Sequence, residues 1–260
     1  MMRSVLAALA AAALAVSAAC SSLSKEDETT GWSAQRLYGE AKDAMASREW
    51  QKAIKYLEKL EARYPYGRFA QQAQIEVAYA YYKQGETAQC ISALEKFVKL
   101  HPNHPNIDYA LYLKGLANFK EDLGPFQAMA KQDLADRDPK AARESFETFK
   151  DLITRYPENR YSNDARERMI YLVEALARHE IHVARWYIMR GAYLAAANRA
   201  QDAIVRFPNS PTHKDALLVL VESYDRMGMA DLRDDAKKVL AKNFPDAGQA
   251  PTSKSWWKFW

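Results

Sequence analysis

Apolar residues recur every three or four positions along most of the chain. A first run of this kind follows Ser33, and a second begins near Trp50 and carries Ile54, Leu57 and Leu60 on one face. This spacing is that of an amphipathic α-helix, and a serine at its start can cap it. The chain has only 9 glycines and no alternating Val, Ile and Thr runs, which argues against a sheet. The pattern therefore predicts an all-α fold.

Prolines end the apolar runs at regular places. Dipeptides of an aromatic residue or His followed by Pro end at Pro65, Pro102, Pro157, Pro208 and Pro245. A glycine precedes three of these prolines at one constant spacing, and small residues precede most of them at two other constant spacings. These small residues are Ala53, Cys90, Ser145 and Ala196 at the shorter spacing and Ala41, Ala78 and Ala184 at the longer one. Each unit is interpreted as a helical hairpin, with a glycine at its turn, a small residue where its helices cross and a proline at its end.

The prolines are separated by 37, 55, 51 and 37 residues. The two 37-residue intervals are near the ~34-residue period of tetratricopeptide repeats, and the 55-residue interval is 18 residues longer because it contains an insert. The sequence thus predicts a right-handed α-solenoid of five tetratricopeptide-like helical hairpins. Repeats 1 to 3 are assigned to residues 33–157, with an insert near 121–137, and repeats 4 and 5 to residues 158–247. No Gly or Pro occurs from 161 to 190, so one helix of about 30 residues is expected there.

The N-terminus has the pattern of a targeting segment. Arg3 precedes an apolar run of 12 residues, Val5 to Val16, which is too short to span a bilayer and suits a signal peptide. Residues 1–19 are therefore predicted to be a lipoprotein signal peptide and Cys20 the lipidated residue. Ser17 stands where such signals usually carry Leu, and ordinary cleavage before Cys20 is the alternative.

Two further segments lack helical periodicity. Residues 20–32 are polar and are interpreted as a lipidated flexible tether between membrane and repeats. Residues 248–260 contain Pro251 and end in Trp-Trp-Lys-Phe-Trp, and they are interpreted as a flexible Trp-rich tail.

Composition narrows the function classes. The net charge is +4, with no long block of one sign, so nucleic acid is not expected as a partner. The sequence has no phosphate-binding loop, nucleophile elbow or paired-cysteine zinc motif, so neither an enzyme nor a metal or cofactor site is predicted. Cys90 occupies a helix-crossing position and is interpreted as a buried small apolar residue.

A stripe of aromatic residues and lysines is the main candidate for binding. Counted from the small residue of each first helix, the positions expected to face the inner groove carry Tyr38, Lys42, Tyr79, Tyr82, Lys83, Tyr112, Phe119 and Lys120. Spacings of three and four place each set on one helical face. Such a groove would suit an extended peptide with aromatic side chains and a free carboxylate. The alternative is that these aromatic side chains fill the core between helices.

The second half of the chain is rich in arginine. Residues 137–206 contain 11 Arg and 2 Lys against 10 acidic residues, and arginine is enriched in protein interfaces. Arg190 and Arg199 are therefore candidates for docking a partner, the alternative for Arg199 being a solvated side chain.

Several segments together resemble the BamD family, a lipoprotein subunit of the outer-membrane β-barrel assembly machinery. They are YPYGRFAQQAQ (64–74), AYAYYKQG (78–85), HPNHPNIDYALYLKGL (101–116), DRDP (136–139) and RGAYLAAANR (190–199). The resemblance implies five tetratricopeptide repeats, a lipid anchor on the periplasmic face of the outer membrane, and no catalysis. It also implies docking of the second-half repeats on the periplasmic domains of the barrel subunit, association with accessory lipoproteins, and binding of targeting signals of unfolded outer-membrane proteins in the first-half groove.

The resemblance thus implies an adaptor that helps to insert and fold outer-membrane proteins. Two other functions suit a helical solenoid with this N-terminus. One is a periplasmic scaffold for pilus or cell-wall assembly, and the other is a peptidoglycan-binding lipoprotein whose aromatic trough stacks sugars.

Overall fold

The computed structural model describes residues 27–119 and 139–245. Within these ranges the chain forms α-helices that pair into five successive hairpins, as the sequence predicts. The hairpins are α2 (Ala34–Ala46) with α3 (Trp50–Arg63), α4 (Arg68–Gln84) with α5 (Thr87–Leu100), α6 (Ile107–Asn118) with α8 (Lys140–Arg155), α9 (Ser162–Met189) with α10 (Tyr193–Arg206), and α11 (His213–Arg226) with α12 (Ala230–Asn243).

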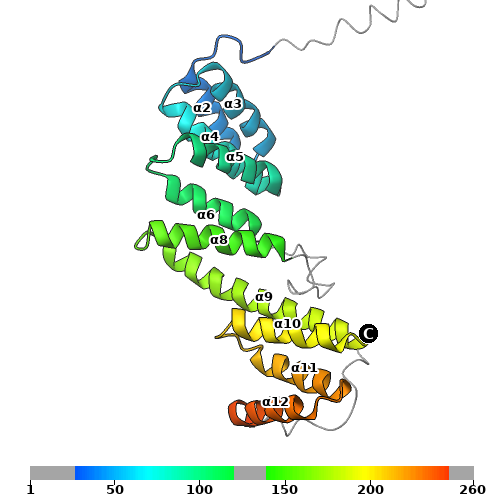
Figure 1. Cartoon of the computed structure of the whole chain (residues 1–260). Helices are drawn as coiled ribbons and strands as arrows, with labels where there is room; N and C mark the ends of the chain where they lie inside the picture. The colour runs from blue at the N-terminus through cyan, green and yellow to red at the C-terminus, as the bar shows by residue number, and fades with distance from the viewer. Residues whose placement is uncertain (1–26, 120–138, 246–260) are drawn as a thin grey trace, which may run out of the picture.

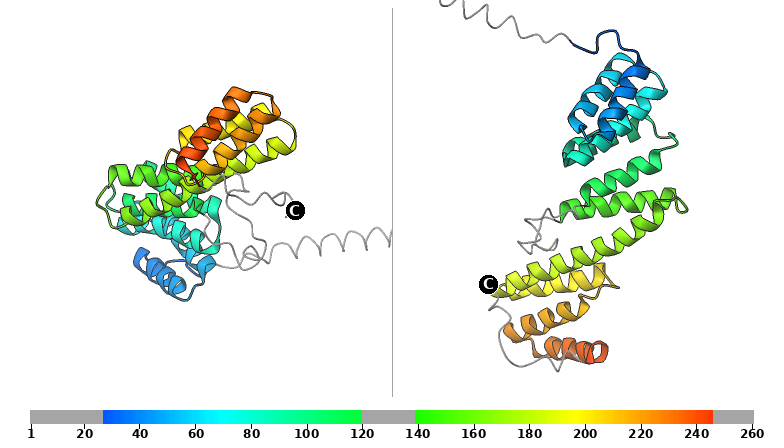
Figure 2. Two further views of the ribbon diagram at one scale, coloured as in Figure 1. Left: turned by 90° about the horizontal axis from the view of Figure 1, so that it is seen from below. Right: turned by 180° about the vertical axis from the view of Figure 1, so that it is seen from behind.

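The hairpins stack into an elongated array that runs from α2 to α12 (Figure 1). Viewed from below, the C-terminal hairpins lie to one side of the N-terminal ones, so the array curves (Figure 2). The first helices of neighbouring hairpins touch: α2 contacts α4, α4 contacts α6, and α9 contacts α11. We call the surface along these helices the first-helix face, and the surface along α3, α5, α8, α10 and α12 the second-helix face.

The small residues found in the repeat pattern lie where the helices cross. All seven are 0% exposed: Ala41, Ala53, Ala78, Cys90, Ser145, Ala184 and Ala196. The position equivalent to Ala41 in the third hairpin is Gly115, where an added Cβ would lie 2.3 Å from the Phe149 ring. The prediction that small side chains permit close helix crossing is therefore confirmed.

The glycines of the pattern end the first helix of their hairpins. Gly85, Gly191 and Gly228 have φ of 79°, 74° and 72°, a left-handed conformation that glycine adopts at little cost. The first hairpin has Arg48 at the corresponding place, and Arg48 also has a positive φ, of 61°.

The long helix predicted in the fourth repeat is α9, which has 28 residues. Its first half packs Ala165 and Leu172 into the same core cluster as Phe97 and Phe149. Its second half packs Ile181 and other residues into a separate cluster with α10, α11 and α12. Helix α9 therefore joins the N-terminal and C-terminal halves of the array.

The N-terminal boundary differs from the prediction of a tether reaching residue 32. Residues 27–32 pack against α3: Asp27 forms ion pairs with Lys59 and Arg63, and Thr29 is fully buried. The hydrogen bond from Lys59 lowers the pKa of Asp27. The sequence pattern did not show this packing, because the partners of these polar residues lie on α3, about 30 residues further along the chain, and local periodicity reports only on neighbouring positions.

Candidate functional site

The N-terminal part of the first-helix face is organised around a buried carboxylate. Glu76 is 7% exposed, and its Oε1 accepts hydrogen bonds from Tyr38 Oη at 2.8 Å, Lys42 Nζ at 3.1 Å and Gln72 Nε2 at 3.1 Å. Burial and then the bond to Glu76 raise the pKa of Tyr38. Tyr38 and Lys42 therefore tie α2 to α4, and Lys42 already has an anionic partner.

Tyr112 and Phe119 lie further along this face, and both are engaged by α8 or α9. Tyr112 stacks on Tyr161 with ring centroids 4.6 Å apart, and its hydroxyl donates to Asp164 Oδ2 at 2.7 Å. Burial and then this bond raise the pKa of Tyr112 to about 12. Phe119 is 7% exposed and packs edge-on against Phe149. The groove prediction is therefore corrected for Phe119, which belongs to the core.

The predicted stripe continues on α4 with Tyr79, Tyr82 and Lys83. Tyr79 is half-buried and makes an edge contact with Trp50 at 6.0 Å. Tyr82 is half-buried against the core, whereas Lys83 is exposed. The structure thus brings these three residues together on α4. Lys120, like Cys20 and the predicted insert and tail, lies outside the described residues.

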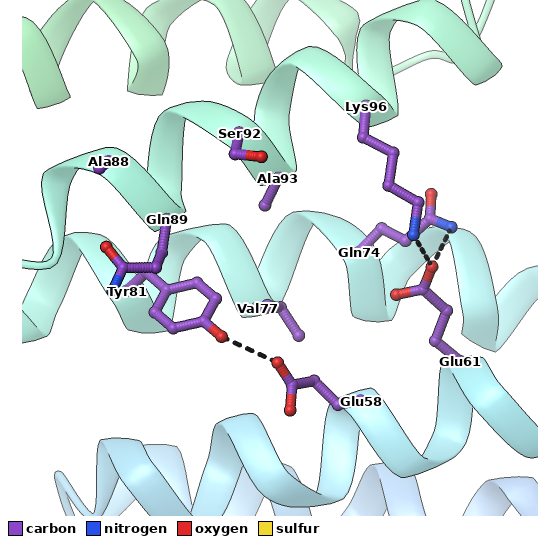
Figure 3. A pocket seen from close by; sticks show the side chains of 10 residues that line it. All are labelled: Glu58, Glu61, Gln74, Val77, Tyr81, Ala88, Gln89, Ser92, Ala93 and Lys96. Atoms are coloured by element: carbon purple, nitrogen blue, oxygen red, sulfur yellow. Dashed lines mark hydrogen bonds and ion pairs between the residues drawn. The ribbon is translucent and has the colours of Figure 1, made fainter.

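The second-helix face carries a hollow that the sequence did not indicate. It has a volume of about 440 Å³ and lies between α3 and α5, with α4 as its floor (Figure 3). It is open because Ala88, Ser92 and Ala93 present short side chains from α5. Carboxylates line the opposite wall: Tyr81 Oη donates to Glu58 at 2.8 Å, and Lys96 Nζ pairs with Glu61 at 2.5 Å.

A second buried carboxylate lies in α9, at the junction of the two halves. Glu180 is 1% exposed. Its oxygens lie 2.6 Å from Arg199 Nη1, 2.7 Å from Arg206 Nη2 and 3.6 Å from Arg143 Nη2. Burial by itself would raise the pKa of Glu180, but the hydrogen bonds from Arg199 and Arg206 outweigh it, and the pKa is lowered. We call these four residues the Glu180 cluster.

The Glu180 cluster changes the interpretation of Arg199. Its side chain is 40% exposed, so it is neither a fully solvated arginine nor an unpaired one. It links α10 to α9, and a partner that contacts Arg199 would contact it while it is paired with Glu180. Local periodicity could have signalled Glu180, because it stands four residues before the crossing residue Ala184 and so on the buried side of its helix.

Arg190, the other predicted docking residue, lies in a different environment. It is exposed at the end of α9, and its guanidinium carbon lies 4.8 Å from the centre of the Trp186 ring. Trp186, Met189 and Leu194 beside it are exposed by 44%, 60% and 62%. We call these four residues the α9–α10 corner. Apolar side chains of this size exposed together on one corner are typical of an interaction surface.

Other kinds of site receive no support from the described residues. In residues 27–119 and 139–245 no group of three His, Cys, Asp or Glu side chains could hold a metal ion. Within the same ranges no helix is long and apolar enough to cross a membrane. Cys90 is fully buried, and burial raises the pKa of its thiol to about 12, as befits a packing residue.

Comparison with known proteins places the chain in a family. A family model described as an outer membrane lipoprotein, YfiO, matches residues 31–240. The chain belongs to this family. It is 44% identical over 237 residues to a Neisseria meningitidis protein named outer membrane protein assembly factor BamD, with 89% of each chain covered. A Xylella fastidiosa protein of the same name is 36% identical, with 87% of this chain and 78% of the relative covered.

Solved structures similar to the chain include a complex of the TPR2AB domain of yeast Sti1 with pHSP90. It has a TM-score of 0.44 and 15% identity, and the match covers 82% of this chain and 78% of that one. A structure of MamA has a TM-score of 0.35 and 16% identity, with 85% and 97% covered.

Proposed function

We propose that this family member is a non-catalytic adaptor in outer membrane protein assembly. The observation that carries the proposal is its similarity, over 89% of both chains, to a protein named outer membrane protein assembly factor BamD. An elongated helical array suits this role because it offers separate surfaces to several polypeptides at once. No observation specifically favours a pilus or cell-wall scaffold, or a peptidoglycan-binding protein.

The adaptor would be held at the periplasmic face of the outer membrane by lipid on Cys20. Two or more acyl chains on one residue give stable anchoring. Replacing the acceptor, Cys20→Ser, should move the protein out of the outer-membrane fraction. Recovery of fully processed Cys20→Ser protein in that fraction would contradict the anchor.

Docking on the barrel subunit is assigned to the second-half repeats, and the α9–α10 corner is the best-supported contact. Tryptophan and arginine dominate the binding energy of many interfaces, and here Arg190 lies over the Trp186 ring. Arg199 lies on the neighbouring helix but is already paired with Glu180. We therefore expect Arg190 and Trp186 to contribute more to docking than Arg199.

Co-purification tests this proposal. The full chain is isolated in mild detergent, and its partners are identified by mass spectrometry. Trp186→Ala and Arg190→Glu should reduce recovery of the barrel subunit and of accessory lipoproteins. Lys150→Glu, on exposed α8 surface, serves as the control. Full recovery of the barrel subunit with both corner variants would exclude the corner, and failure of the unaltered chain to recover it would exclude the adaptor role.

Targeting segments of unfolded outer-membrane proteins are proposed to bind on the first-helix face around Tyr79, Tyr82 and Lys83. Aromatic side chains of a segment can pack on the half-buried tyrosines. An exposed ion pair between Lys83 and a carboxylate of the segment would add only about 0.2–1 kcal/mol to the binding free energy. Tyr82→Ala should therefore weaken peptide binding more than Lys83→Gln does. Fluorescence anisotropy with an aromatic-rich peptide measures the two effects, and equal affinity of Tyr82→Ala and the unaltered chain would rule out this face.

A further inference from the structure

The last hairpin of the array, α11 with α12, is packed on one side only. Elsewhere the first helix of one hairpin packs against both helices of the hairpin before it: α4 contacts α2 and α3, α6 contacts α4 and α5, and α11 contacts α9 and α10. In the described ranges no helix follows α12, so nothing there covers α11 and α12 in this way. The end repeats of a solenoid need a polar outer surface or a cap over their apolar residues.

A hollow lies between α11 and α12, and we call it the end hollow. Its volume of about 630 Å³ is within the range of about 300–1,000 Å³ that is typical of ligand pockets. Its apolar lining comes from α11 and consists of Leu218, Val219 and Val221. Leu218 is 40% exposed, so the last hairpin presents an apolar side chain to solvent in a concave place.

Cationic side chains surround this apolar lining. They are Arg185 from α9, Arg226 from α11, and Arg233 and Lys237 from α12. Two of the guanidiniums are held by carboxylates: Arg185 lies 2.5 Å from Asp215, and Arg233 lies 3.0 Å from Asp225. A guanidinium that is paired along its edge keeps its flat faces for stacking, and the face of an aromatic ring attracts a cation. The end hollow therefore suits aromatic side chains.

The chain that leaves α12 carries aromatic side chains of this kind. Phe244 packs against the C-terminal core cluster, and the residues after 245 lie outside the described ranges. The Trp-rich tail contains two lysines and four aromatic residues: Trp256, Trp257, Phe259 and Trp260. No other segment of the chain has four aromatic residues among five.

The tail is long enough to reach the end hollow of its own chain. Lys237 and Arg233 stand six and ten residues before Asn243, the last residue of α12, which is about 9 and 15 Å along the helix. From Phe244 to Trp256 there are twelve residues, and an extended chain of that length spans about 40 Å. The aromatic residues can therefore return along α12 to the hollow without strain.

We propose that the aromatic residues of the Trp-rich tail bind in the end hollow of the same chain and cap the last hairpin. Their rings would lie on the apolar lining and against the arginine faces, as Trp186 already lies under Arg190 in this chain. A lysine of the tail would pair with Glu222, which also lines the hollow. A short tether gives the tail a millimolar effective concentration at the hollow, which favours its own chain over a second copy. The cap goes beyond the adaptor role and needs no partner.

Hydrogen exchange measured by mass spectrometry tests the cap on the full chain in detergent, because it reports on the tail and on the hollow separately. Leu218→Glu places a charge in the apolar lining at a side chain that is partly exposed. Val205→Glu, at a valine of α10 that is 78% exposed, is the matched control. A tail variant replaces Trp256 and Trp257 with serine.

We expect tail amides to exchange about tenfold faster in Leu218→Glu than in the unaltered chain, because apolar burial of the rings is lost. The tail variant should speed exchange in α11 and α12 by a similar factor, because helices without a cap open more often. Combining the two changes should give no further increase, since both remove one contact. Val205→Glu should leave exchange in both regions unchanged.

Three results would overturn the proposal. If the tail amides are protected equally in Leu218→Glu and in the unaltered chain, the tryptophans lie in the detergent and not in the hollow. If protection is lost when the unaltered chain is diluted, the tail occupies a second copy. If the tail of the unaltered chain exchanges as fast as a free peptide of the same sequence, no cap forms. The adaptor role is tested separately by co-purification, so it stands or falls independently of these results.

Discussion

Glu180 Oε2 lies 2.6 Å from Arg199 Nη1, so the arginine that sequence singles out for docking holds together the helices of its own hairpin. Arg206 shares the same carboxylate from one end of α10, and Arg143 approaches it from α8. The cluster therefore connects three helices at the junction of the two halves. A substitution at Arg199 therefore breaks a contact within the chain, whether or not Arg199 also contacts a partner.

Reversal of charge at this position should destabilise the fold. Arg199→Glu places a second carboxylate against the buried Glu180 and removes one of its partners, and loss of a partner by a buried polar group costs about 1–3 kcal/mol. Arg199→Met keeps most of the packing of the stem, so its loss in unfolding free energy should be smaller. Urea unfolding followed by circular dichroism measures both. Arg190→Glu, at the exposed corner, is the control and should change the unfolding free energy by less than about 0.5 kcal/mol.

If Arg199→Glu unfolds at the same urea concentration as the unaltered chain, the cluster does not stabilise the junction. If Arg199→Glu is destabilised as expected, its failure to co-purify with a partner would not show that Arg199 lies in an interface, because the loss could result from the damaged fold. The corner variants at Trp186 and Arg190 avoid this ambiguity, because both side chains are exposed.

The Glu180 cluster should also make stability depend on pH in the acid range. The folded pKa of Glu180 is lowered from the ordinary 4.5, so the folded state favours the ionised carboxylate. Its contribution is therefore fully present above pH ~4.5 and is lost as the pH falls through the folded pKa. Glu180→Gln removes this contribution. The difference in unfolding free energy between the two proteins should shrink below pH 4.5, and a difference that grows on acidification would contradict the lowered pKa.

The helix crossings could be predicted from sequence because they depend on local spacing. Small residues such as Ala78 stand at one sequence distance before the prolines of their repeats, and turn glycines such as Gly85 stand at another. Each distance corresponds to one position in the hairpin, the helix crossing or the turn. Glu76 and Phe119 could not be placed in this way. The partners of Glu76 come from α2 as well as α4, and Phe119 is covered by Phe149 and Tyr171, which follow the predicted insert. Burial of these residues depends on how hairpins stack, and one hairpin's periodicity carries no information about that.

For the candidate site, too, the sequence showed which residues share a helix but not which residues from different helices come together. Sequence identified Tyr79, Tyr82 and Lys83 as neighbours, since they share one helix. It could not reveal the hollow between α3 and α5 or the convergence on Glu180, because Arg143 and Arg206 belong to different hairpins, on α8 and α10. Contacts between second helices of successive repeats have no fixed spacing, so they require the structure.

The tight crossing at Gly115 predicts a large effect from one methyl group. In Gly115→Ala the Cβ would lie 2.3–2.7 Å from three ring atoms of Phe149, which is 0% exposed and cannot move away freely. Overpacking of this kind costs about 1–3 kcal/mol. Gly39→Ala is the matched control, because nothing lies within 4 Å of its added Cβ and Gly39 is in the interior of α2.

Gly39→Ala should stabilise the chain by up to about 1 kcal/mol, the difference in helix propensity between the two residues. Thermal unfolding of both variants gives the comparison. Opposite signs would confirm that the third hairpin depends on glycine for close packing. A loss in Gly39→Ala as large as in Gly115→Ala would show that helix crossing is not the cause.

The first hairpin offers the reverse experiment. Arg48 adopts φ of 61° at the turn where the second, fourth and fifth hairpins have glycine, and a non-glycine residue there costs about 1–2 kcal/mol. Arg48→Gly relieves this cost but gives the unfolded chain more conformational freedom, which offsets part of the gain. We expect a net stabilisation of about 0.5–1 kcal/mol, measured by urea unfolding. Gly85→Ala, at the equivalent turn of the second hairpin, should be destabilised by a similar amount. If Arg48→Gly is instead less stable than the unaltered chain, the positive φ at Arg48 is not strained, and the equivalence of the hairpin turns would have to be abandoned.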